Sequence, residues 1–171
     1  MAVITFSTKF PSYHPKKGSP TFFVEKFQGA LYNLGVDLSA FIKYPETHME
    51  NNLWNQAPKN TTIRKGHRWK AGDYFSPRIW GNDTNPKSGR IGPYHSQQIT
   101  FGPDTLITAT WDFEIKNGNF YINKKLVDHK SGTMLLVAKN DGLSFRDLTD
   151  WFKYPKPFDG QIIAWNKAVE Y

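Results

Sequence analysis

The chain has 171 residues, of which 39% are hydrophobic, so it can bury a core and is predicted to form a single domain. Its 22 lysines and arginines outnumber its 15 aspartates and glutamates. The resulting net charge of +7 favours phosphate-bearing partners, although charge mixed along the chain serves solubility equally well. The absence of cysteine excludes disulfides, thiolate nucleophiles, iron–sulfur clusters and cysteine-based zinc sites.

The sequence carries no pattern of a secreted, membrane or metal-binding protein. Segment 1–18 lacks the apolar core of a secretory signal, and no apolar run approaches the roughly 18–20 residues that a membrane span needs. We therefore expect a cytoplasmic protein with no membrane partner. The five histidines are scattered singly and no glycine-rich phosphate loop is present, so no metal and no cofactor are predicted.

The first part of the chain predicts a strand followed by a helix. Residues 1–10 alternate as a strand does and end in a loop that contains proline and glycine. A helix is predicted over 20–34, with Ser19 as its N-cap and Pro20 in its first position. Segment 36–57 is ambiguous and reads as a second helix and a loop. The apolar residues that recur at helical spacing in 20–34 are Phe23, Phe27, Ala30 and Leu31.

The middle of the chain predicts mainly strands. Residues 61–66 read as a short strand, 70–80 as a turn and another strand, and 82–95 as a long loop rich in Gly, Pro, Asn and Ser. The segments that follow predict a strand meander, in which the sequence KNGN supplies an Asn-Gly hairpin turn. These segments are 96–102, 105–118 and 119–127.

The C-terminal part predicts one more apolar element over 132–140, a helix and a closing strand over 160–171. Ser144 is the expected N-cap of the helix, and Asp147 is the acid of a capping box. Strands outnumber helices without a regular β–α alternation. This order predicts an α+β fold, a mixed β-barrel with helices packed at its openings.

The stretch KNTTIR is the most informative for chemistry. On a regular strand, alternate side chains share a face, which places Thr62 and Arg64 together and Lys59 opposite. Lys59 and Thr62 can cooperate only if the chain bends near Asn60 or the strand starts at Thr61. The alternative is a basic edge strand whose lysine prevents edge-to-edge aggregation.

The order of four short segments resembles the ASCH domain family of the PUA-like superfamily. It is most similar to the small bacterial ASCH proteins that hydrolyse N4-acetylcytidine, which share a Phe-Phe helix start, a Lys-x-x-Thr-Ile-Arg strand and a Gly-Asp turn. The resemblance implies one PUA-like β-barrel domain over 1–171, with an N-terminal extension and an inserted loop around 81–98. The four segments are TFFVEKF (21–27), KNTTIR (59–64), WKAGD (69–73) and NDGLSFRDL (140–148).

The resemblance also implies a catalytic group. In those hydrolases the lysine and threonine of the strand act with a glutamate just before the last helix. Here they correspond to Lys59, Thr62 and Asp141, which is one methylene shorter than the family's glutamate. Thr62 would be the nucleophile, Lys59 with a lowered pKa its base in a dry pocket, and Asp141 the group that orients the lysine or the substrate amine. The alternative is an exposed lysine, an ordinary strand threonine and a turn acid.

A second group of side chains suits a nucleotide ligand. It offers guanidinium groups for phosphate, aromatic faces for a base, and hydroxyl and amide groups for base edges. Its members are Arg78, Trp80, Arg90, Tyr94, Ser96 and Gln97. Arg64 joins them, because the family resemblance puts it beside the pocket. In the alternative interpretation the aromatic residues are core or loop anchors and the arginines lie in solvent. Trp111 and Trp151 are predicted to be core.

Three functions stay open at this point. The first is an amidohydrolase acting on an N-acylated cytosine nucleoside, and the second is a non-catalytic module that binds RNA or a modified nucleotide. The third, suggested by ASCH relatives, is a single-strand ribonuclease, for which the sequence offers no metal cluster and no convincing histidine pair.

Overall fold

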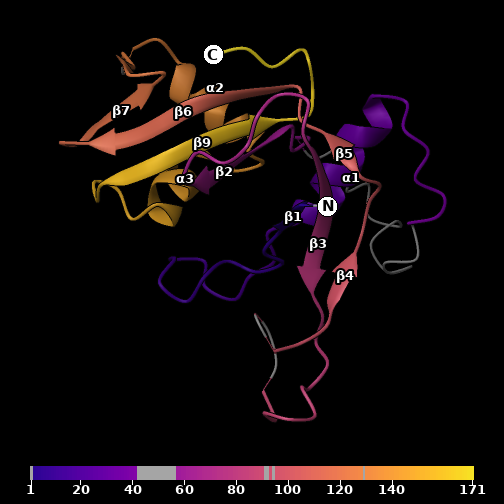
Figure 1. Ribbon diagram of the computed structural model, residues 1–171. Helices are drawn as coiled ribbons and strands as arrows, with labels where there is room; N and C mark the ends of the chain where they lie inside the picture. Colours follow the sequence, from indigo (N-terminus) through magenta and orange to yellow (C-terminus); the bar gives the residue numbers. More distant parts are fainter. Residues whose placement is uncertain (1, 42–56, 91–92, 94, 129) are drawn as a thin grey trace.

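The computed structural model describes residues 2–41, 57–90, 93, 95–128 and 130–171, and it contains two sheets and three helices (Figure 1). The elements are, in chain order, β1 (Ala2–Thr5), α1 (Phe23–Asn33), β2 (Thr61–Lys65), β3 (Tyr74–Trp80), β4 (Gln98–Thr100), β5 (Thr105–Leu106), β6 (Ala109–Lys116), β7 (Asn119–Ile122), β8 (Lys125–Leu126), α2 (Thr133–Asn140), α3 (Phe145–Trp151) and β9 (Phe158–Ala164).

The α+β class is confirmed, but the described strands do not close into a barrel. In the first sheet β3 pairs in parallel with β1 and antiparallel with β4 and β5. The second sheet is antiparallel in the order β2-β9-β6-β7-β8. The predicted single meander is therefore wrong. The chain leaves the first sheet after Leu106 and enters the second at Ala109, because β5 pairs back onto β3 whereas β6 pairs with β9.

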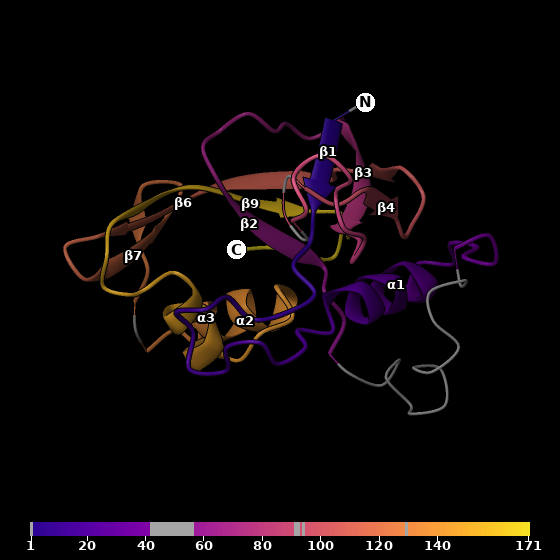
Figure 2. The same cartoon turned by 90° about the horizontal axis from the view of Figure 1, so that it is seen from below.

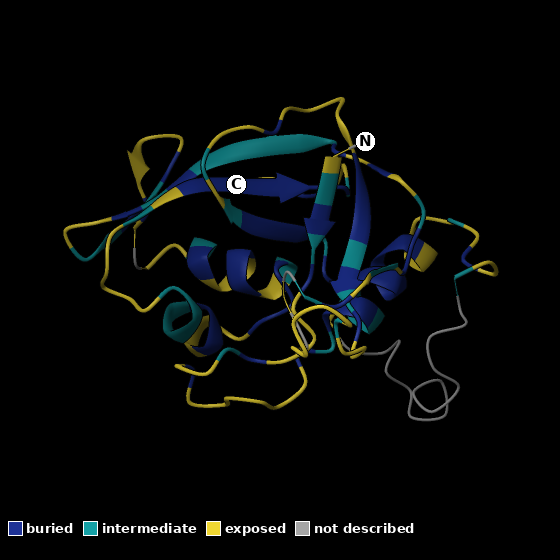
Figure 3. Cartoon of the chain, turned by 60° about the horizontal axis from the view of Figure 1, so that its bottom comes forward, coloured by how far each residue is buried: buried dark blue, intermediate teal, exposed yellow. Residues whose placement is uncertain are grey.

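One hydrophobic cluster joins the two sheets to the helices. Helices α2 and α3 cover a face of the five-stranded sheet, while α1 lies by the four-stranded sheet (Figure 2). Phe27 of α1 is fully buried, and its ring centroid lies 4.9 Å from that of Trp165 and 5.5 Å from that of Phe101. Strands β2, β3 and β9 are mostly buried (Figure 3). In the part of the chain described, no helix is long and apolar enough to cross a lipid bilayer.

Helix α1 begins later than predicted. It starts at Phe23 after Phe22, which has a left-handed φ of 57° and whose side chain makes no capping hydrogen bond. Ser19 and Thr21 cannot be helical, because their backbones pair with the segment after β1: Ser19 O accepts from Phe10 N, and Thr21 N donates to Thr8 O. The apolar face predicted for this helix is buried as expected.

The later elements agree more closely with the sequence. The apolar element over 132–140, whose type the sequence left undecided, is helix α2. Ser144 caps α3 by accepting a hydrogen bond from Asp147 N. Asn117 and Gly118 both have positive φ, as a two-residue hairpin turn between β6 and β7 requires. The last strand ends at Ala164, and the first ends at Thr5, so both are shorter than predicted. The helix suggested in 36–57 falls largely on residues 42–56, outside the described part.

Gly160 allows β2 and β9 to approach closely. A Cβ at this position would overlap the backbone carbonyl of Arg64 and lie 2.9 Å from the Phe158 ring. We expect Gly160→Ala to lower the free energy of unfolding by about 1–3 kcal/mol, because β2 must move away. Urea denaturation measures the change. Gly18→Ala is the control, since its Cβ would meet nothing within 4 Å and only its φ of +77° is unfavourable. A loss in Gly160→Ala well below about 1 kcal/mol would contradict the steric argument.

His67 joins the loop after β2 to two other strands. Its Nδ1 lies 2.9 Å from an Asp112 carboxylate oxygen on β6, and its Nε2 lies 2.8 Å from one of Asp159 on β9. Both nitrogens donate only in the imidazolium form. The hydrogen bond to Asp159, supported by Asp112, raises the pKa of His67 above its ordinary value.

This contact predicts a pH-dependent contribution to stability. The pKa of His67 is higher in the folded than in the unfolded chain. The stabilisation is therefore fully present below the unfolded pKa and lost as pH rises through the folded pKa. Urea unfolding of wild type and His67→Gln should differ more at about pH 6 than at about pH 8.5. Because the pair is exposed, salt should reduce the difference. A pH-independent difference would refute the assignment.

Candidate functional site

A cavity of about 270 Å³ brings together segments that are far apart in the sequence. Its wall is formed by the end of β1, the start of α1, β2, the turn after α2, and the end of α3. The described residues that line it are Thr5, Phe6, Ser7, Phe23, Lys59, Thr62, Ile63, Arg64, Trp80, Pro93, Asp141, Trp151 and Phe152. The three residues predicted as catalytic, with Arg64 and Trp80, therefore lie around one cavity.

Lys59 and Asp141 form a buried ion pair in this wall. Lys59 Nζ donates to Asp141 Oδ1 at 2.7 Å and to the Asp141 backbone oxygen at 2.6 Å. It also lies 4.2 Å from the centroid of the Phe23 ring. Lys59 is 1% exposed and Asp141 6%. The interpretation of Lys59 as an exposed edge-strand lysine is thus wrong.

Burial sets the pKa values of the pair. Removal from water disfavours the ammonium and lowers the pKa of Lys59 to about 8, although the Asp141 carboxylate opposes the shift. Burial also raises the pKa of Asp141, against the effect of the Lys59 ammonium. With a pKa of about 8, Lys59 is neutral in an appreciable fraction of molecules near neutral pH and can then accept a proton.

The local backbone explains how Lys59 reaches the cavity. Strand β2 starts at Thr61, one of the two arrangements that the sequence analysis required. Before it, Lys59 N donates to Lys26 O at 3.0 Å and Asn60 N donates to Asn140 O at 2.7 Å. Gly142 follows with a φ of +75°, and a Cβ there would lie 3.3 Å from Lys59 Cβ. A glycine turn is therefore needed to place Asp141 against Lys59.

Arg64 brings a second, half-buried cation to the cavity. Its Nη2 donates to Thr5 O at 2.6 Å, and its guanidinium carbon lies 5.5 Å from the centroid of the Phe6 ring. Its Nε is buried and has no hydrogen-bond partner. Burial lowers the pKa of Arg64 to about 10, so it stays charged near neutral pH. The unused N–H makes Arg64 a candidate donor to a ligand oxygen.

Thr62 presents a hydroxyl that the described protein does not use. The residue is 4% exposed and lines the cavity, and its hydroxyl makes no hydrogen bond with the residues that the structure describes. Thr61, its neighbour, lies outside the cavity lining. Thr62 and Arg64, which share a face of β2, both line the cavity, and Ile63 between them lines it too.

Aromatic side chains complete the wall, and sequence reasoning missed most of them. Phe23, Trp151 and Phe152 line the cavity together with Trp80, and the ring centroids of Phe23 and Trp151 lie 5.6 Å apart. Trp151 was predicted to be core but is only half-buried, because it ends α3 at the cavity. The sequence did contain one indication that Trp151 lies at the site: it occupies the last turn of a capped helix that closely follows Asp141.

Of the other five residues predicted to contact a ligand, the four that the structure describes do not line this cavity. Arg78 Nη1 donates to Gln98 Oε1 across β3 and β4, Arg90 is exposed, and Ser96 Oγ donates to Asp83 O. Gln97 uses its backbone oxygen to accept from Gly81 N. Tyr94 lies outside the described residues. Ligand binding by these five residues remains a prediction.

The segment that connects β3 and β4 has a shape that keeps most of its described residues away from the cavity. It projects away from the two sheets (Figure 1). It also closes on itself, since Asn85 N donates to Arg90 O and Asn85 Nδ2 donates to His95 O. Of its described residues, Pro93 reaches the cavity, next to Trp80 at its base.

No arrangement of three or more His, Asp or Glu side chains suited to a metal ion occurs among the described residues. Comparison of the chain with protein-family models, with curated proteins and with solved structures found no match. The resemblance to the ASCH family thus rests on the four sequence segments alone.

Proposed function

We propose that the chain is a PUA-like protein of the ASCH type whose cavity binds a nucleoside and hydrolyses an N-acyl amide on a cytosine-like base. The observation that carries the proposal is a buried lysine whose pKa is about 8 in the same cavity wall as an unengaged threonine hydroxyl. A cavity of about 270 Å³ suits a small ligand better than a polynucleotide.

The chemistry follows from the roles that each group can take. Neutral Lys59 accepts the proton of the Thr62 hydroxyl while the oxygen attacks the acyl carbon. The C–N bond then breaks, and the proton passes from Lys59 to the departing exocyclic amine. Water hydrolyses the resulting Thr62 ester in the same way and regenerates the hydroxyl. Asp141 orients Lys59 through the 2.7 Å hydrogen bond.

Arg64 and the aromatic wall supply binding. The unused Arg64 Nε–H is suited to a carbonyl or oxyanion on the ligand, where a charged donor stabilises developing negative charge. Trp80 and Trp151 offer faces on which a base can stack.

Incubation of the purified protein with N4-acetylcytidine tests the proposal, with conversion to cytidine followed by ultraviolet absorbance. We expect turnover with a kcat/KM that rises with pH and levels off above about pH 8, because the active form has neutral Lys59. Absence of turnover both below and above about pH 8 would refute the hydrolase proposal.

The second candidate is a binding module without catalysis. It is favoured by the completeness of the Lys59–Asp141 pair, in which the ammonium donates twice to Asp141 and faces the Phe23 ring. It predicts binding of RNA, single-stranded DNA or a nucleotide that weakens with salt and is equal in wild type and Thr62→Val. Titrations at low salt that show no binding would exclude the binding-module candidate. The ribonuclease alternative gains no support, since no histidine occurs in the described lining.

A further inference from the structure

A second cavity, of about 440 Å³, lies next to the first and has a different character. The turn after α2 separates them: Asp141 lines the first cavity and Gly142 the second. Its wall also includes residues of the loop before α1, of α1 and of the α3 N-terminus. Its polar and charged lining residues are Lys16, Ser19, Thr21, Lys26, Lys139, Ser144 and Asp147.

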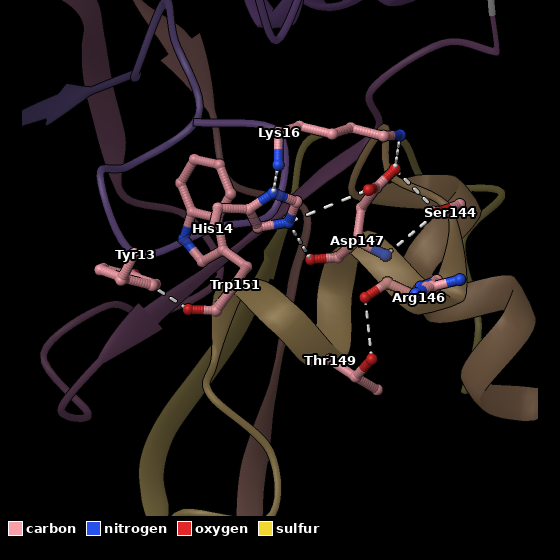
Figure 4. A network of polar contacts seen from close by, with 8 residues as sticks. All are labelled: Tyr13, His14, Lys16, Ser144, Arg146, Asp147, Thr149 and Trp151. Carbon is pink, nitrogen blue, oxygen red and sulfur yellow. Dashed lines mark hydrogen bonds and ion pairs between the residues drawn. The ribbon is translucent and has the colours of Figure 1, made fainter. Parts of the chain in front are cut away.

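Positive charge is in excess in this wall. Three lysines face one carboxylate among the described lining residues. That carboxylate is already engaged, because Asp147 Oδ2 accepts from Lys16 Nζ at 2.8 Å and from Ser144 Oγ at 2.8 Å (Figure 4). The described lining residues therefore carry a net charge of +2, and the carboxylates of Glu25 and Asp141, outside the lining, also act on Lys26.

Lys26 is the most buried of the three lysines. Its Nζ donates to Gly142 O at 2.7 Å, a single bond for a group with three donors. Burial lowers the pKa of Lys26, and the nearby Lys16 ammonium adds to the shift, whereas the carboxylates of Asp147, Glu25 and Asp141 oppose it. The side chain of Lys139 makes no hydrogen bond or ion pair with the described residues. Both ammonium groups therefore have donors available to a ligand.

The wall that carries Lys16 is held in place. His14 is buried between Phe10 and Trp151, with ring centroids at 4.4 and 6.3 Å. Its Nδ1 accepts from Lys16 N at 3.0 Å, so its Nε2–H donates to Asp147 O at 3.2 Å (Figure 4). These bonds fix the loop around Lys16 to α3. A preorganised cation cluster binds an anion with little cost in side-chain ordering.

We propose that this second cavity is an anion site for a phosphate dianion, either orthophosphate or a phosphate monoester, held by Lys26, Lys139 and Lys16. The charge of about −2 on such a group near neutral pH matches the net charge of the lining. A concave site favours a terminal phosphate over the extended backbone of a polynucleotide. The proposal does not depend on the hydrolase chemistry of the first cavity.

Calorimetric titration of the purified protein with orthophosphate, in a phosphate-free buffer at low salt, tests the site. We expect saturable one-to-one binding. Lys139→Gln should weaken it about tenfold, since a charged donor is lost. Lys26→Gln should weaken it at least as much. Lys139 is exposed and its side chain makes no hydrogen bond or ion pair with the described residues, so its replacement leaves the fold intact even if Lys26→Gln is unstable.

Lys17→Gln is the matched control, because it removes the same charge from an exposed lysine outside the cavity lining. Binding equal in Lys17→Gln and Lys139→Gln would show a general charge effect and overturn the proposal. Titration with cytidine 5′-monophosphate and with a single-stranded RNA distinguishes the sources of phosphate. Binding of orthophosphate, or binding of the monophosphate that Lys139→Gln weakens, supports the site. Binding of RNA alone, or of the monophosphate with no dependence on Lys139, overturns it. Thr62→Val should leave orthophosphate binding unchanged, which separates this site from the proposed hydrolase.

Discussion

Asp141→Ala is expected to lower the free energy of unfolding by about 3–5 kcal/mol near neutral pH, the largest loss that we predict for a single substitution. The substitution leaves the Lys59 ammonium buried without its carboxylate, and Lys59 is 1% exposed. Urea or guanidinium denaturation measures the change. The loss should shrink as pH rises above the lowered pKa of Lys59, because the neutral amine needs no partner.

A double variant provides the control. Lys59→Met combined with Asp141→Leu removes both charges while keeping apolar volume, and it should recover most of the lost stability. Asp141→Ala placed in a Lys59→Met background should cost much less than in wild type. If it costs the same, the ion pair is not the reason for the loss, and the turn at Asp141 itself must matter.

Thr62→Val is expected to lower kcat/KM for N4-acetylcytidine by at least about 10³-fold, because it removes the proposed nucleophile. The free energy of unfolding should change by less than about 1 kcal/mol, since the hydroxyl has no hydrogen bond with the described residues and valine keeps the shape. Steady-state kinetics and urea denaturation on the same preparation measure the two effects.

Thr62→Ser is the matched variant, since it keeps the hydroxyl and deletes one methyl group. It should retain activity within about tenfold of wild type. Equal activity of the valine and wild-type proteins would exclude Thr62 as the nucleophile. Loss of activity in both variants would instead indicate a packing role for the Thr62 methyl group.

Local patterns in the sequence predicted elements well where the determining contacts are local. Ser144 and Asp147 lie three residues apart, so the cap of α3 forms within one turn. The turn at Asn117 and Gly118 likewise depends on two residues that adopt positive φ. The start of α1 was misplaced because Ser19 and Pro20 are good cap residues whose backbone is used by a distant segment, residues 8–10.

The candidate site was predictable only in part. Thr62 and Arg64 share a strand face, which follows from alternation alone. Asp141 entered through a resemblance and not through any local signal, since an Asn-Asp-Gly sequence is typical of an ordinary turn. Arg78 and Arg90 were predicted as ligand contacts because their guanidinium groups suit phosphate, but Arg78 is held by Gln98 on the neighbouring strand and Arg90 is exposed.

Composition, charge and side-chain periodicity are properties of the chain itself, and they determined the α+β class, the approximate positions of most strands and helices, and the basic character of the surface. The pairing of strands into two sheets, the burial of Lys59 and the second cavity around Lys26 were decided by tertiary structure. The physical reason is that desolvation depends on what surrounds a group. A lysine has an ordinary pKa until distant segments exclude water from it, and here those segments are α1, β2 and the turn at Asp141.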